Sequence, residues 1–275
     1  MRSIHFFWIL LSAMIFTMPQ ARAETITVSG STTVKKYMQL VADAYMQTHP
    51  DVHFSINGGG STSGFGQLID RRVDIGMMSR NLTVEEQQTL GDVQHVAVAV
   101  DAVVPVVSHE VQQSGVSQIT PSMLADIYRG KITNWKQVGG ADRQILLVDK
   151  EMHRGTRHVF AQYVLGSPTA AVSPEAITLE SNDDVVNIVS GSDQAIAYVS
   201  FSYVNALVYG LDLQIEGKLV AATVENIRSG AYPISRKLYV LLPNDASAQV
   251  QAFVRFILSV KGQRLVERAG YLPIQ

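Results

Sequence analysis

The chain has 275 residues, with 22 lysines and arginines against 24 aspartates and glutamates and a formal net charge of −2. This balance argues against nucleic acid as a partner, because nucleic-acid-binding proteins usually carry a strongly basic surface. A cysteine count of zero excludes disulfide bonds and thiolate metal sites. The length is enough for one large core or for two lobes.

Residues 1–23 have the pattern of a secretory signal peptide. Arg2 precedes an apolar run from Phe6 to Phe16, and Ala21-Arg22-Ala23 is a small-x-small cleavage site. The run is shorter than a typical membrane span, although an uncleaved anchor is the alternative. No cysteine follows it, which argues against a lipoprotein. We therefore expect cleavage after Ala23 and a periplasmic location.

The chain after this segment alternates between strand and helix patterns. Ile26 and Val28 alternate with threonine, as in a half-buried strand, and a stripe with helical spacing runs from Val34 to Tyr45. Further strands are expected at 52–56 and 73–78, a helix at 65–69, and a capping box at Thr83 and Glu86. This β-α-β-α-β order predicts an α/β lobe with a mainly parallel sheet.

Two β-rich runs, Val93–Val107 and Tyr232–Leu242, are longer than a usual strand. A strand that leaves one lobe and enters another explains such a length. Other elements are expected as a helix starting at Thr120-Pro121, strands at 145–148 and 195–199, and helices at 159–164 and 246–269. We predict an α/β, two-lobed fold with two strand crossovers, in which 24–101 and 233–275 form the first lobe and 102–232 the second.

Three short turns rich in glycine and hydroxyl groups each follow a predicted strand and precede a predicted helix. They are Ser29–Thr33, Gly58–Gly64 and Arg154–Arg157. A helix N terminus has unpaired N–H groups and a partial positive charge, so it attracts anions. One turn alone is weak evidence, since Ser31 and Thr33 are also good helix caps. The repetition predicts an oxyanion held by several helix starts.

The loop Gly58–Gly64 matches neither of two catalytic motifs. Thr62 stands where a nucleophile elbow has serine, and the Gly-Lys-Ser/Thr ending of a P-loop does not follow. A flexible glycine-serine linker is the plain alternative. The histidines form no metal-binding pattern, and no Ser-His-Asp set or carboxylate pair is evident. We therefore predict no enzymatic activity, no metal and no cofactor.

Arginines near these turns add local positive charge. Arg154 and Arg157 flank Gly155-Thr156, and Ser79-Arg80 follows the third predicted strand. A guanidinium group donates two parallel hydrogen bonds to an oxyanion, although an arginine taken singly is as often a surface residue. The three arginines are candidates for an anion site that is built locally.

In their order and spacing, these motifs resemble the phosphate-binding proteins of bacterial ABC transporters. These are periplasmic binding proteins of the two-lobed class II type, and the resemblance covers the whole chain after the leader. The matching segments are Gly30–Thr33, Gly58–Gly64, Asp74–Gly76 with Ser79-Arg80, Tyr128–Trp135, Gly155–Arg157, Ile196–Val199 and Tyr232–Ile234.

The resemblance implies that inorganic phosphate lies in the cleft between the lobes and is handed to an inner-membrane ABC permease by a monomeric receptor. It implies that hydroxyls and amides of the first two turns bind from one lobe, and those of Gly155 and Thr156 from the other. The candidate phosphate-binding residues are Ser31, Thr32, Thr33, Ser61, Thr62, Ser63, Ser79, Arg80, Arg154, Gly155, Thr156 and Arg157.

This sequence departs from the family pattern in two regions, the third turn with its upstream strand and the segment after the third predicted strand. Arg154 replaces the serine of a Ser-Gly-Thr turn, and Lys150 occupies the place of an upstream arginine. Ser79-Arg80 stands where some members have an aspartate that accepts a proton from phosphate, and such an acceptor rejects sulfate. The alternatives are a receptor for another oxyanion, either sulfate-like or a phosphorylated small molecule, and a sensor or adhesion module on the same fold.

Overall fold

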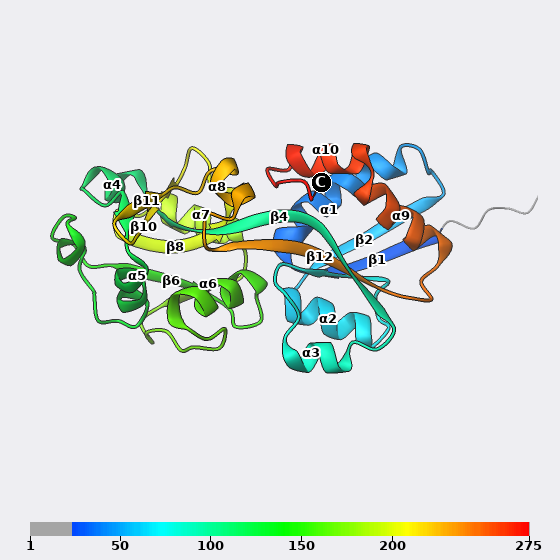
Figure 1. The fold of residues 1–275 in the computed structure, drawn as a ribbon, viewed down its shortest axis with the longest axis horizontal. Helices are drawn as coiled ribbons and strands as arrows, with labels where there is room; N and C mark the ends of the chain where they lie inside the picture. The colour runs from blue at the N-terminus through cyan, green and yellow to red at the C-terminus, as the bar shows by residue number, and fades with distance from the viewer. Residues whose placement is uncertain (1–23, 275) are drawn as a thin grey trace, which may run out of the picture.

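The computed structural model describes residues 24–274, so the predicted signal peptide at 1–23 lies outside the described residues. Two lobes lie side by side, and the long strands β4 (Val93–Val107) and β12 (Ser235–Pro243) run from one to the other (Figure 1). These strands pair antiparallel from Ser235 opposite Ala102 to Pro243 opposite Val93. The predicted two-lobed α/β fold with two strand crossovers is confirmed.

The first lobe is built from both ends of the chain. Its sheet has the order β2-β1-β3-β12-β4, in which β1 pairs in parallel with both β2 and β3. Helices cover both faces of this sheet, as the helical stripes between its strands predict (Figure 1). The elements are β1 Glu24–Gly30, α1 Thr32–Met46, β2 Val52–Gly58, α2 Ser61–Ile69, β3 Ile75–Met78, α3 Val84–Thr89, α9 Ala248–Leu258 and α10 Val260–Arg268.

The second lobe continues the same sheet on the other side of β4. The strand order there is β4-β8-β6-β7, with β9 also on β4, and a separate small sheet has the order β11-β10-β5. The elements are α4 His109–Gln113, β5 Gln118–Ile119, α5 Pro121–Tyr128, the 3-10 helix η1 Trp135–Val138, β6 Leu146–Lys150, α6 Gly155–Leu165, β7 Ile177–Leu179, α7 Asn182–Ser190, β8 Ala195–Ser200, η2 Phe201–Tyr203, β9 Tyr209–Gly210, β10 Asp212–Ile215, β11 Lys218–Val220 and α8 Val224–Ser229.

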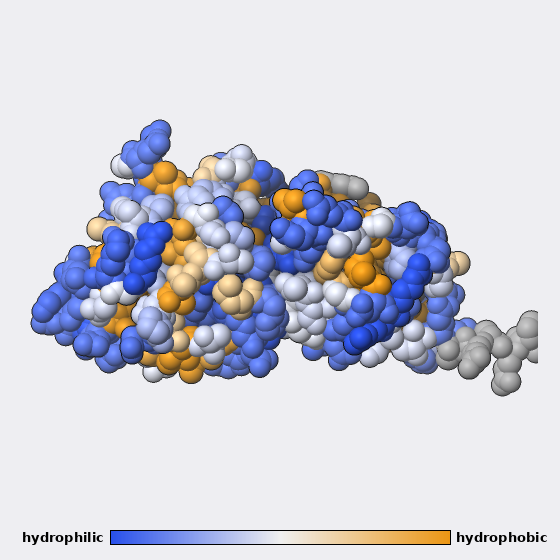
Figure 2. Space-filling view, turned by 90° about the horizontal axis from the view of Figure 1, so that it is seen from below, coloured by the Kyte–Doolittle hydropathy of each residue, from blue (hydrophilic) through white to orange (hydrophobic). Residues whose placement is uncertain are grey.

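The two lobes have separate hydrophobic cores, and in the first lobe a smaller second cluster packs Phe65, Leu68, Met78, Leu82 and Leu241. The first-lobe core draws on residues 26–99 and 238–271, and the second-lobe core on residues 102–234 together with Leu272. The change from one core to the other therefore falls on the two crossover strands. Seen from below, the lobes remain distinct masses, and hydrophobic residues form small separate patches on this face (Figure 2).

The predicted C-terminal helical stretch is helical and consists of two helices that meet at Ser259. Ser259 adopts an extended backbone with ψ 162°, and its hydroxyl accepts a hydrogen bond from the Gly262 amide at 3.2 Å. A serine that caps a new helix competes in this way with continuation of the old one. The apolar faces of α9 and α10 still pack on the first lobe, as their amphipathic pattern predicts.

No helix between residues 24 and 274 is both long and apolar enough to cross a membrane.

Candidate anion-binding site

A small cavity of about 10 Å³ lies where the lobes meet. This volume is about the space of one water molecule. The residues around it come from the starts of α1, α6 and α7, from the turn before α2, and from the ends of β3 and β6. They are Ser31, Thr32, Thr33, Gly60 and Ser79 of the first lobe, and Lys150, Arg154, Gly155, Thr156, Glu180 and Asn182 of the second.

The N terminus of α1 reaches the cavity because β1 and β3 are closely packed there. Gly30 has φ 137°, and a Cβ atom at this position would lie 2.3 Å from the Met77 carbonyl oxygen. Glycine is therefore required where β1 turns into the helix. The turn presents Ser31, Thr32 and Thr33, and the first-turn amides of α1 have no partner within the helix.

Two glycines let the lobes touch beside the cavity. A Cβ atom at Gly155, the first residue of α6, would lie 2.3 Å from Ser61 Oγ and 2.4 Å from Ser79 Oγ of the opposite lobe. Gly60 has φ 88°, and a Cβ atom there would lie 2.9 Å from the carbonyl oxygen of His153. Glycines within the predicted anion-binding turns thus also allow close approach of the two lobes.

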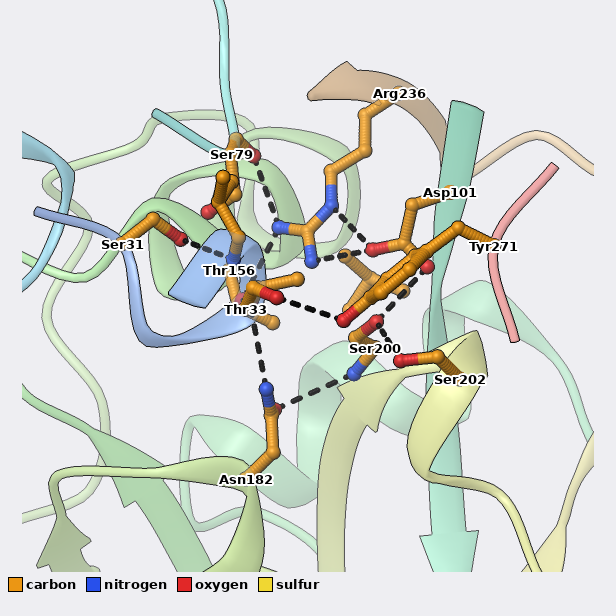
Figure 3. A network of polar contacts seen from close by, with 12 residues as sticks. Ser31, Thr33, Ser79, Asp101, Thr156, Asn182, Ser200, Ser202, Arg236 and Tyr271 are labelled. Carbon is orange, nitrogen blue, oxygen red and sulfur yellow. Dashed lines mark hydrogen bonds and ion pairs between the residues drawn. The ribbon is translucent and has the colours of Figure 1, made fainter. Parts of the chain in front are cut away.

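Hydrogen bonds between side chains join the lobes across the site (Figure 3). Thr33 Oγ1 and Thr156 Oγ1 share a hydrogen bond at 3.2 Å, and Asn182 Nδ2 donates to Thr33 Oγ1 at 3.2 Å. Arg236 Nη1 donates to Thr156 Oγ1 at 3.1 Å and to the Ser79 carbonyl at 3.0 Å. Hydroxyls from both lobes therefore converge on the same small volume.

A buried ion pair ties this network to the crossover strands. Asp101 on β4 accepts from Nε and Nη2 of Arg236 on β12, at 3.0 and 2.8 Å, and from the Ser200 hydroxyl at 2.9 Å. Because the Arg236 guanidinium also bonds to Ser79 and Thr156, one side chain connects both crossover strands with both lobes (Figure 3).

Among residues 24–274, five basic side chains are buried, and Lys150 differs from the other four. The arginines each contact a carboxylate, in the pairs Arg80–Glu86, Arg154–Glu151, Arg157–Asp149 and Arg236–Asp101. No carboxylate oxygen of the described residues lies within 4.0 Å of Lys150 Nζ, which donates to the Ser181 carbonyl at 3.0 Å. Burial, followed by the charges of Arg236 and Arg154, lowers the pKa of Lys150 to about 7.

Seven of the twelve sequence candidates line the cavity: Ser31, Thr32, Thr33, Ser79, Arg154, Gly155 and Thr156. Ser61 lies beside it, with its hydroxyl accepting from the Ser79 amide at 3.1 Å. Thr62 and Ser63 point elsewhere, toward Arg80 and Gln67.

The remaining two candidates, Arg80 and Arg157, do not line the cavity. Arg80 is held by Glu86 and lies in a separate groove of about 1300 Å³ between the lobes. Arg157 points into the second lobe, where its guanidinium donates to the carbonyls of Pro168 and Ala170. Each guanidinium therefore has protein acceptors of its own.

Five residues at the site are absent from the sequence candidates: Gly60, Lys150, Glu180, Asn182 and Arg236. The capping box formed by Ser181 and Asp184 at the start of α7 is a signal that could have identified Asn182. Arg236 had no local signal, because it lies within a strand. Within the described part of the chain, no group of three or more His, Asp or Glu residues is placed to hold a metal ion.

Comparison with known proteins places this architecture among binding proteins. The family model described as PBP superfamily domain matches residues 17–261. Phosphate-binding protein PstS of Bacillus subtilis is 30% identical over 251 residues, which cover 91% of this chain and 81% of the relative.

Two solved structures share both sequence and fold with the chain. A putative phosphate ABC transporter substrate-binding protein with bound phosphate from Clostridium perfringens is 32% identical with a TM-score of 0.84, over 92% of this chain and 100% of that one. An ABC-type phosphate transport receptor from Vibrio cholerae is 33% identical with a TM-score of 0.72, over 90% and 99%. The chain therefore belongs to the PBP superfamily, in the family of phosphate ABC transporter substrate-binding proteins.

Proposed function

We propose that this protein captures inorganic phosphate in the cavity between its lobes and delivers it to an ABC permease of the inner membrane. The observation that carries the proposal is Lys150, a buried cation that faces the cavity and contacts no carboxylate of the described residues. A buried charge is costly unless it is paired, so the site favours an anionic ligand. The names of the relatives supply the identity of that anion.

The neutral part of the proposed site consists of hydroxyls and helix N termini. Thr32, Thr33 and Thr156 bring hydroxyls and amides from α1 and α6, and Asn182 begins α7. These donors match the acceptor-rich surface of a phosphate ion. Arg154 also lines the cavity, but its guanidinium forms ion pairs with Glu151 and Glu180.

The other sequence candidates take supporting parts in this proposal. Ser61 holds Ser79 in place, and Arg80 connects Thr62 to α3 through Glu86. Arg157 anchors the start of α6 to the second lobe. They shape the site from outside the cavity lining.

The cavity lies between two lobes that must move to admit an ion from solvent. A volume of about 10 Å³ holds about one water molecule, so an ion enters only when the lobes move apart. The hinge for this movement lies in β4 and β12, which are the two connections that cross between the cores. Binding and release of the ion neither make nor break a covalent bond, so the proposed function is not enzymatic. We further propose that it acts in the periplasm as a monomer.

Isothermal titration calorimetry of the chain from residue 24 with sodium phosphate tests the proposal. We expect saturable binding at micromolar or lower concentrations, and its absence would contradict the proposed function. Thr33→Val, which keeps the shape but removes the hydroxyl, should weaken binding, while Thr169→Val on an exposed loop serves as the matched control.

Sulfate is the competing candidate, and one observation favours including it. Among the described residues, Glu180 is the only carboxylate that lines the cavity. Its side chain is 74% exposed and forms an ion pair with Arg154. This exposed and paired carboxylate therefore gives little discrimination against a fully deprotonated anion such as sulfate. Competition between phosphate and sulfate across pH 6 to 8 decides between them, because only phosphate titrates in that range.

A further inference from the structure

Lys150 has a property that its neighbouring arginines lack, because its charge can be removed near neutral pH. Its side chain is 4% exposed and lines the cavity at the end of β6. Of the three protons on its ammonium group, one is donated to the Ser181 carbonyl at 3.0 Å. No second acceptor for Nζ is found among residues 24–274.

The carboxylates around Lys150 are occupied by other donors. The adjacent Asp149 points to the opposite side of the strand, where it binds Arg157 and the Tyr198 hydroxyl. Asp184 on α7 accepts from the amide and hydroxyl of Ser181. Charged groups surround Lys150 on every element packed against it. The positive ones are Arg236 on β12 and Arg154 before α6. The negative ones are Asp149 on β6, Glu151 before α6, Glu180 and Asp184 around the start of α7, and Asp101 on β4.

Two of these groups are fixed positive charges that lie close enough to oppose the charge of Lys150. Burial and then Arg236 and Arg154 lower its pKa to about 7, against weaker opposing effects of Asp184 and Asp149. A phosphate ion in the cavity would add negative charge beside Nζ and reverse this balance. The protonated form of Lys150 is then favoured when phosphate is bound and disfavoured when the cavity holds no phosphate.

We propose that Lys150 couples anion capture to proton uptake, so that an ion arriving above neutral pH is bound together with a proton that Nζ takes from solvent. This inference rests on the proposed function, since it assumes that phosphate is the anion. The proton adds to the free lone pair of the neutral amine, and release of the ion returns it to solvent. An arginine in the same place would stay charged and would show no such coupling.

The linkage gives the sign and size of the effect. With a pKa of about 7 in the free protein, about nine-tenths of the Lys150 side chains are neutral at pH 8 and about one-tenth at pH 6. Wild type should therefore take up about 0.9 more proton per phosphate than Lys150→Arg at pH 8, and about 0.1 more at pH 6. Its affinity should fall about tenfold per pH unit above pH 7 relative to the arginine variant. The ionisation of phosphate itself is the same for both proteins and cancels.

The experiment is calorimetry of inorganic phosphate binding at pH 6 and pH 8, each in two buffers with different heats of ionisation, which counts the protons exchanged. Wild type is compared with Lys150→Arg and with Lys218→Arg, a matched control on the exposed strand β11. Proton counts that are equal in wild type and Lys150→Arg at pH 8 would overturn the inference and leave the proposed function standing. An absence of phosphate binding in wild type would overturn both.

Lys150→Met provides a second route if the larger guanidinium prevents binding. Its affinity should be well below that of wild type at pH 6, and the ratio between the two should shrink about tenfold for each pH unit above 7. A ratio that stays constant from pH 6 to pH 9 would contradict proton coupling. Circular dichroism and thermal unfolding confirm that each variant is folded.

Discussion

The close approach of Gly155 to the opposite lobe gives a direct test of closure. Gly155 begins α6, and a Cβ atom there would lie 2.3 Å from Ser61 Oγ and 2.4 Å from Ser79 Oγ, both on the opposite lobe. Gly155→Ala should therefore obstruct the closed arrangement without disturbing either core. Its backbone needs no positive φ, so alanine fits the helix itself.

The expected loss of affinity follows from the cost of overpacking. Forcing one methyl group into a close-packed contact costs about 1–3 kcal/mol. If that cost falls entirely on the closed, liganded form, phosphate binding should weaken about 5- to 150-fold, at about 1.4 kcal/mol per factor of ten. The unfolding temperature without phosphate should change little, because the lobes can move apart. With phosphate present, the variant should gain less thermal stability than wild type.

Gly66→Ala is the matched control for this experiment. Gly66 lies inside α2, and a Cβ atom there meets no atom within 4 Å. The substitution should leave phosphate affinity unchanged and stabilise the fold by about 0.5–1 kcal/mol, because alanine is the better helix former. Wild-type affinity in Gly155→Ala, measured by the same calorimetry, would refute the reasoning that this contact forms in the liganded state.

Three further predictions concern charge and capping. Asp101→Asn leaves Arg236 buried without its counter-charge, so urea unfolding should show a loss of about 3–5 kcal/mol; a loss below 1 kcal/mol would argue against the pair. Thr83→Ala removes the cap of α3, whose capping box includes Glu86, and should cost about 0.5–2 kcal/mol in stability with unchanged phosphate affinity. Burial and then Arg80 lower the pKa of His158 to about 4. Stability should therefore fall as pH drops from about 6.5 to 4, since the unfolded chain binds the proton more readily. His158→Gln should flatten that part of the stability profile, and an unchanged slope would contradict the assignment.

The Asp101–Arg236 pair gives the hinge a physical connection to the site. Both residues lie on crossover strands, and Arg236 donates to groups of both lobes, Ser79 and Thr156. A movement that separates the lobes must break at least one of these bonds. Lobe closure and the placement of the Thr156 hydroxyl are therefore coupled through one guanidinium group.

Local patterns in the sequence predicted the elements and the helix starts. The alternation at Ile26 and Val28, the stripe from Val34 to Tyr45, and the length of Val93–Val107 depend only on neighbours along the chain, and each reappears as β1, α1 and β4. The capping box at Thr83 and Glu86 is present for the same reason. The break at Ser259 escaped prediction because a serine within an amphipathic stretch suits either a continuous helix or a new cap.

The sequence by itself determined that this chain folds as two α/β lobes with glycine and hydroxyl turns at their helix starts. Only the tertiary structure decided which cations face the cavity. Arg80 and Arg157 lie near predicted turns, but Glu86 and the carbonyls of Pro168 and Ala170 hold them elsewhere. Lys150 remains at the cavity because carboxylates near it are bound to other donors. Where a buried charged side chain points depends on which counter-charges the fold brings within a few ångströms of it. Spacing along the chain does not encode that distance.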